Sequence, residues 1–85
     1  MVNTSIHPRG NGDKFDYMFL SRLQLDCKYF LGFGARSPEV LWAKNVELHI
    51  LIMKEFFNSF KGDQIPEWIT MKDIEFYESE MMKDI

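Results

Sequence analysis

The stretch that decides the fold is residues 37–60, which read SPEVLWAKNVELHILIMKEFFNSF. Ser37 can cap a helix with its hydroxyl oxygen, and Pro38 suits the first helical position, where no N–H is needed. At about 100° per residue the apolar side chains form one broad arc. This arc is about twice as wide as the roughly 100° stripe of a helix that packs on one neighbour. The sequence therefore predicts one long central helix with neighbours on two sides.

A first helix is predicted over residues 16–31, where apolar side chains recur at i, i+3, i+4 and i+7. Asp13 or Asp16 would cap its start, and Gly32 would be the left-handed residue after its last turn. The link of residues 32–36 is short, which predicts that the first and central helices are antiparallel neighbours.

A third helix is predicted from about residue 71 to 82. Gly62 and Pro66 would end the central helix before it. Thr70 and Asp73 have the spacing of a capping box, with Asp in place of Glu. Three helices with short links indicate a small bundle.

The predicted fold class is thus all-α, a small three-helix bundle with a long central helix. A flexible N-terminal arm is expected over residues 1–14 and a helical domain over residues 15–85, with Trp68 or Ile69 packed at the start of the third helix. The predicted helix caps are Ser37 and Thr70. The predicted core consists of inward-facing residues of the three helices: Leu20, Leu23, Cys27, Phe30, Trp42, Val46, His49, Met53, Phe56, Trp68, Ile74 and Tyr77.

Composition narrows the class of protein. Of the 85 residues 46% are hydrophobic and 15% aromatic, which argues against disorder and for one dense core. The net charge is −3 and no Lys/Arg stripe is visible on one helix face, which argues against direct nucleic-acid contact. No run approaches the roughly 18 apolar residues of a membrane span, and the N-terminus lacks a signal-peptide core. The single cysteine excludes an internal disulfide and fits a reducing compartment, so a cytoplasmic protein is expected.

Cys27 and His49 are the two side chains best suited to catalysis or metal binding. With Asn45 they suggest a nucleophilic set, and with His7 a metal site. A reactive cysteine needs a lowered pKa and a pocket, whereas a structural zinc needs four ligands at familiar spacings. We therefore predict that both are packing residues and that the chain is not an enzyme. No catalytic residue, metal or cofactor is expected.

A second apolar stripe follows the first helix on roughly the side opposite its core face. Met18, Leu25 and Tyr29 lie at i, i+7 and i+11, and Phe33 follows in the link. Exposed patches rich in Met and aromatic residues mark partner surfaces. These residues are the predicted partner surface. Two alternatives stay open, namely burial under the N-terminal arm or the third helix, and homodimerisation.

Several segments together carry a family resemblance. They are DCKYFLGFG at residues 26–34, LW at 41–42, HI at 49–50, MK at 53–54, PEWIT at 66–70 and IEFYE at 74–78. This pattern resembles the eleventh family of large polyvalent protein-associated domains, over residues 16–82. Cys27, Trp42, His49, Trp68 and Thr70 match its pattern, and we interpret them as core, cap and packing residues.

The resemblance implies a setting more than a mechanism. Such domains are carried by phages, plasmids and conjugative elements, often beside DNA-processing, methyltransferase or anti-restriction domains, and without a catalytic assignment. We therefore expect a small non-catalytic module that binds a protein partner for a mobile genetic element. It would modulate or inhibit a host defence or accompany DNA transfer. The alternatives are a nucleic-acid-associated regulator, a structural homodimer, and an enzyme that depends on Cys27.

Overall fold

The computed structural model describes residue 8 and residues 14–83 of the chain. It contains three α-helices, α1 (Lys14–Leu31), α2 (Val46–Ser59) and α3 (Met71–Met81). Two short 3₁₀ helices, η1 (Pro38–Val40) and η2 (Gly62–Gln64), lie in the links. No strand occurs in the described part, so the predicted all-α three-helix bundle is confirmed. Most of the predicted arm, residues 1–7 and 9–13, lies outside the described residues.

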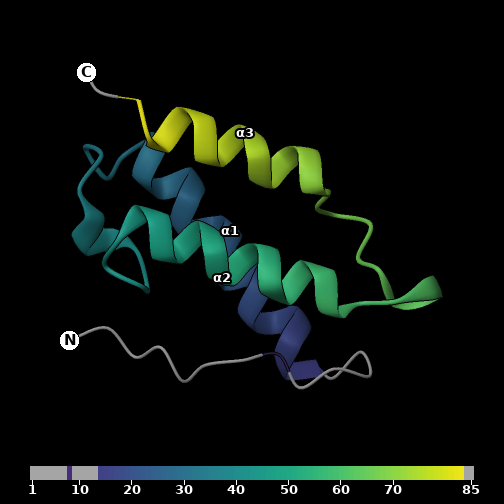
Figure 1. Ribbon diagram of the computed structural model, residues 1–85. Helices are drawn as coiled ribbons and strands as arrows, with labels where there is room; N and C mark the ends of the chain where they lie inside the picture. The colour runs from purple at the N-terminus through teal and green to yellow at the C-terminus, as the bar shows by residue number, and fades with distance from the viewer. Residues whose placement is uncertain (1–7, 9–13, 84–85) are drawn as a thin grey trace.

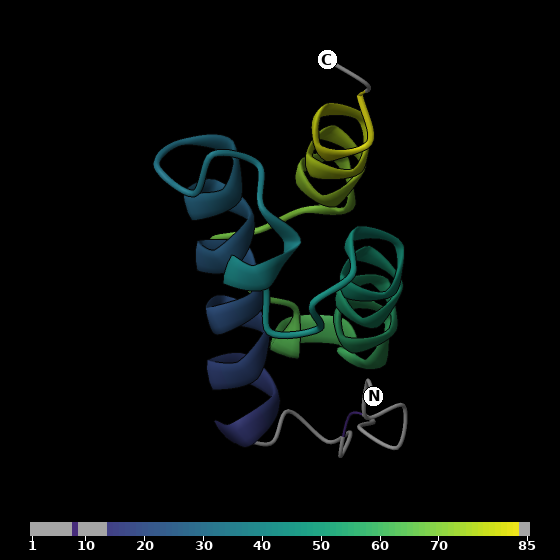
Figure 2. The same ribbon diagram turned by 90° about the vertical axis from the view of Figure 1, so that its left-hand side faces the viewer.

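The three helices form two layers. α2 and α3 lie side by side and run in opposite directions, and α1 crosses behind α2 and ends beside the C-terminal end of α3 (Figure 1). Seen from the side, α1 forms one layer and α2 with α3 the other (Figure 2). Each helix contacts the other two. The first and second helices are therefore neighbours as predicted, but α1 crosses α2 obliquely instead of lying antiparallel along it.

The prediction of one helix from residue 37 to 60 is wrong in its first third. Ser37 caps only η1, accepting a hydrogen bond from the backbone N–H of Glu39 at 3.3 Å. The chain then turns through Lys44, whose φ is 59°. Asn45 caps α2 instead, because its side-chain oxygen accepts from the backbone N–H of Leu48 at 2.8 Å. An Asn side chain that bonds nearby backbone in this way starts a helix and interrupts a longer one.

The core lies where the three helices meet. Two predicted core residues, Trp42 and Val46, are only partly buried and pack against its edge. Trp68 lies outside the core, with 44% of its surface exposed, whereas Ile69 is fully buried. Of this neighbouring pair, only Ile69 faces inward. The buried apolar residues are Leu20, Leu23, Cys27, Phe30, Leu41, Ala43, Ile50, Ile52, Met53, Phe56, Phe60, Ile69, Ile74, Tyr77 and Met81.

The ends of α1 and α3 are joined through the link after α1. Gly32 does not take the predicted left-handed conformation, which falls instead on Ala35 (φ 53°) and Arg36 (φ 58°). Gly34 is required by close approach, because a Cβ there would lie 3.0 Å from a carbonyl oxygen of the last turn of α1. The Nη2 of Arg36 donates to the carbonyl oxygen of Glu80 at 2.7 Å. A cation at these carbonyls stabilises the C-terminal end of α3. At its other end, α3 begins with the predicted Thr70 capping box.

Candidate functional site

Cys27 is held in the core as a neutral thiol. It is fully buried in α1, and its Sγ lies 3.4 Å from the Sδ of Met53 on α2. Burial, and then the negative charge of Asp26, raise the pKa of Cys27 to about 12. The thiolate is the nucleophilic form of cysteine, and this environment suppresses it at neutral pH. The arrangement is that of a packing residue.

This environment predicts slow thiol chemistry in the folded protein. At neutral pH we expect a disulfide reagent to label Cys27 at least about a hundredfold more slowly in the native chain than in urea, because labelling requires an opening that costs several kcal/mol. The measurement is the release of the chromophore over time, with urea-unfolded protein as the reference. Prompt labelling of the native chain, at the reference rate, would contradict the assignment.

His49 joins α2 to α1 through one hydrogen bond. Its Nε2 lies 3.0 Å from the backbone oxygen of Leu23, and the residue is fully buried. A carbonyl oxygen only accepts, so Nε2 carries the proton and Nδ1 the lone pair. Within the described chain no hydrogen-bond partner reaches Nδ1. Burial is the main cause that lowers the pKa of His49 below its ordinary value, and the neutral ring is the form that packs here.

Among the described residues, the three members of the catalytic set weighed from the sequence each make their polar contact with a residue outside this set. The polar contacts of Cys27 and His49 go to Met53 and Leu23, and the side chain of Asn45 is engaged in capping α2. In the described part of the chain no three side chains of the His, Cys, Asp or Glu type lie close enough together to hold a metal ion. His7, the third residue of the considered metal set, lies outside the described residues.

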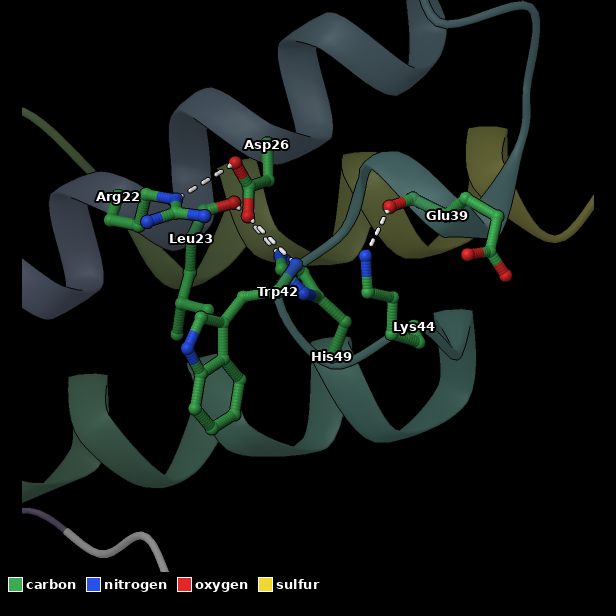
Figure 3. A network of polar contacts seen from close by, with 7 residues as sticks. All are labelled: Arg22, Leu23, Asp26, Glu39, Trp42, Lys44 and His49. Atoms are coloured by element: carbon green, nitrogen blue, oxygen red, sulfur yellow. Dashed lines mark hydrogen bonds and ion pairs between the residues drawn. The ribbon is translucent and has the colours of Figure 1, made fainter. Parts of the chain in front are cut away.

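Asp26 is one of three buried polar residues, with Asp16 and Gln24, that sequence reasoning missed. Its side chain is nearly buried between α1 and the link that precedes α2 (Figure 3). One carboxylate oxygen accepts from the backbone N–H of Trp42 at 2.9 Å, and the other accepts from Nε of Arg22 at 3.2 Å. The bond to Trp42 holds the link against α1, whereas the bond to Arg22 lies within α1. The i, i+4 spacing to Arg22 was the available signal, but it predicts only the ion pair and not the bond to Trp42.

The outer side of α1 carries the predicted partner surface. Met18, Leu25, Tyr29 and Phe33 are 50% to 89% exposed, so α2 and α3 leave them uncovered. The rings of Tyr29 and Phe33 lie 6.4 Å apart, centre to centre. Exposure is the condition that a partner surface requires. The assignment as a binding surface itself stays a prediction.

Trp68 extends this surface. It lines a shallow depression of about 430 Å³ together with Tyr17, Met18, Ser21, Arg22 and Leu25. A second depression of about 410 Å³ is lined by Phe15, Met18, Phe19, Arg22 and Trp42. The two depressions share Met18 and Arg22 and are therefore adjacent. We use "α1 face" for the exposed residues Met18, Leu25, Tyr29, Phe33 and Trp68.

The exposed charged side chains of α1 itself are of one sign, although the exposed Glu67 directly precedes Trp68 in the chain. The exposed charged residues of α1 are Lys14, Arg22 and Lys28, whereas its two acidic residues, Asp16 and Asp26, are buried. The surface of this helix is therefore basic in a chain whose net charge is −3. The sequence shows both signs along α1, and only folding removes the acidic side chains from its surface.

Three of the four acidic residues of α3 have ordinary structural roles. Glu78 pairs with Lys54 of α2 at 2.9 Å, and Glu80 pairs with Lys83 at 2.8 Å. Asp73 completes the capping box at the start of the helix. These pairs are partly exposed, and contacts of this kind contribute between about 0 and 1 kcal/mol each.

Comparison with known proteins gives one match. The family model described as large polyvalent protein-associated domain 11 matches residues 13–81 of the 85-residue chain. Neither the curated proteins nor the solved structures contain a match to the chain. The matched segment includes all three helices, the Asp26 network and the whole α1 face.

Across residues 14–83 no helix has both the length and the apolar character needed to cross a bilayer.

Proposed function

Because the chain belongs to the large polyvalent protein-associated domain 11 family, we propose that it is a non-catalytic helical module that binds another protein through its α1 face. The single observation that carries this proposal is the exposure of Met18, Leu25, Tyr29, Phe33 and Trp68 along one side of the molecule. Methionine and aromatic residues are enriched in protein interfaces, and large exposed apolar patches mark them.

The chemistry of the interior supports binding over catalysis. The Cys27 thiol is neutral and buried, and the His49 ring is committed to the backbone of α1. An enzyme site combines a perturbed titratable group with an open pocket that substrate can enter. Here the three groups with perturbed pKa values, Cys27, His49 and Tyr77, lie in the core. The two depressions beside Met18 are lined mainly by apolar and aromatic side chains.

The biological setting is the second part of the proposal. The module would serve a mobile genetic element such as a phage or plasmid, either by modulating or inhibiting a host defence or by accompanying DNA transfer. The family description, which associates the domain with large polyvalent proteins, supports this setting. A free, buried cysteine suits a reducing cytoplasm. A nucleic-acid-associated regulator and a structural homodimer are the alternatives, and both would use the same face.

Site-specific photo-crosslinking in living cells tests the proposal. A photoreactive phenylalanine derivative is placed in the full chain at Leu25, on the α1 face, or at Asn58, an exposed residue of α2. We expect a discrete protein adduct from position 25 only. The added change Tyr29→Asp should reduce this adduct at least about tenfold, since interface anchors contribute about 2 kcal/mol or more. Because Tyr29 is half-exposed, this change should alter folding stability by no more than about 0.5 kcal/mol.

The control position decides the outcome. Equal adducts from positions 25 and 58 would indicate non-specific collision, and the proposal would then fail. The same conclusion would follow if position 25 gave no adduct while urea denaturation showed that the labelled chain is folded.

A further inference from the structure

We infer that the α1 face takes an acidic amphipathic helix of its partner protein, with apolar anchors on the face and carboxylates against its basic rim. This inference rests on the proposed function, because it specifies the partner of the same surface. It is carried by the charges that folding leaves on α1 and by the two adjacent apolar depressions beside Met18.

Folding buries the acidic side chains of α1 and leaves its basic side chains exposed. Asp16 is fully buried and Asp26 is nearly so, the latter bound to the Trp42 backbone and to Arg22. Lys14, Arg22 and Lys28 stay at the surface. Charged rims around an apolar centre set which partners are attracted and how fast they associate. The rim of this face attracts carboxylates and repels basic segments.

The apolar part of the face suits a helix. Met18 and Leu25 are seven residues apart on α1, which places them on one side of the helix, two turns apart. The depressions on either side of Met18 can each accept one large side chain. An amphipathic helix presents such anchors at i and i+3 or i+4, with its polar residues on the flanks. Glutamates on those flanks would lie beside the cations of α1.

Nucleic acid fits this surface less well. The rings of Tyr29, Phe33 and Trp68 could stack on bases, so it is charge that disfavours nucleic acid here. The chain as a whole carries a net charge of −3, which opposes a polyanion at long range more than it opposes a short acidic helix. A second copy of the chain is the other occupant to test, because α3 has an acidic outer side with Phe76 exposed.

The test uses two synthetic peptides of about 18 residues that differ only in charge. Both carry leucines at helical spacing and a fluorescent label, and the flanking residues are all Glu in one and all Lys in the other. Fluorescence anisotropy with the full chain measures their affinities. We expect the Glu peptide to bind at least about tenfold more tightly, and the difference to shrink as salt rises from about 50 to 300 mM.

Charge-reversed variants locate the effect on α1. The double variant Lys14→Glu and Lys28→Glu should bind the Glu peptide about tenfold more weakly than the parent chain, because attraction becomes repulsion at two rim positions. Lys72→Glu makes the same kind of change on an exposed residue of α3 and should alter the affinity by less than about twofold. Far-UV circular dichroism checks that each variant is folded.

Each outcome decides for or against the inference. Equal affinity for the two peptides, no binding of either, or no effect of the α1 reversals would overturn it. It would also be overturned if labelled oligo-dT bound more tightly than the Glu peptide. A molar mass that rose with protein concentration, and fell when Leu25 was changed to Asp, would point to a second copy instead. If the peptide or oligo-dT results overturn the inference, an adduct from position 25 to a different protein would keep the proposed protein-binding function, whereas the absence of such an adduct would remove that function itself.

Discussion

Replacing Asp26 by alanine is expected to lower the free energy of unfolding by about 2–3 kcal/mol, although the residue lies at the edge of the core. Its carboxylate accepts the backbone N–H of Trp42 at 2.9 Å and Nε of Arg22 at 3.2 Å. Hydrogen bonds to charged groups contribute about 1.5–3 kcal/mol, and removing the acceptor leaves the N–H of Trp42 without this partner. Urea denaturation followed by circular dichroism measures the change.

Two further variants separate the two bonds of Asp26. Arg22→Gln removes only the ion pair and should cost about 0.5 kcal/mol, since the Arg22 side chain is 58% exposed and water screens the pair. Asp26→Asn keeps an oxygen that can accept from Trp42 and should fall between the other two variants. If Asp26→Ala lowered the free energy of unfolding no more than Arg22→Gln does, the bond to the Trp42 backbone would not contribute to holding the link.

The same bond explains where local sequence patterns predict this fold and where they do not. Periodicity and the Thr70 capping signal place α1 and α3 within about two residues, because these features depend on neighbours along the chain. The same kind of pattern places the start of the central helix at Ser37, whereas α2 begins at Val46. Ser37 and Pro38 are a genuine start signal, but they begin only η1. The link then leaves the helical path through a contact between residues 16 positions apart, Asp26 and Trp42, which no local pattern contains.

Local sequence patterns also predict only part of the candidate surface. The stripe of Met18, Leu25 and Tyr29 follows from helical periodicity, because it lies opposite a clear core face. The prediction that Trp68 belongs to the core is wrong, since either Trp68 or Ile69 fits the core by composition and only packing against the other helices decides between them. The basic character of α1 could not be predicted either. It results from the burial of Asp16 and Asp26, and sequence reasoning expects acidic residues at the surface.

His49 gives the second large expected effect, a loss of stability in mild acid. Burial lowers the pKa of His49 in the folded chain, whereas the unfolded chain retains a pKa of about 6.5. As pH falls below about 6.5 the unfolded state therefore binds a proton before the folded state does. Stability is fully present above this pH and declines below it, until the pH reaches the lowered folded-state value. The slope can approach about 1.4 kcal/mol per pH unit, the value for one proton.

The structural reason is that the folded chain has no place for the second proton. Nε2 already donates to the oxygen of Leu23, and a protonated Nδ1 would be a buried donor with no acceptor within reach among the described residues. Urea denaturation between about pH 5 and 7 isolates this effect, because most carboxylates titrate below that range. His49→Leu should be less stable than the parent at pH 7 but nearly flat across the range. His7→Asn, which changes the other histidine, should retain the parent slope. A flat parent curve, or a slope that survived His49→Leu, would contradict the assignment of His49 as the titrating group.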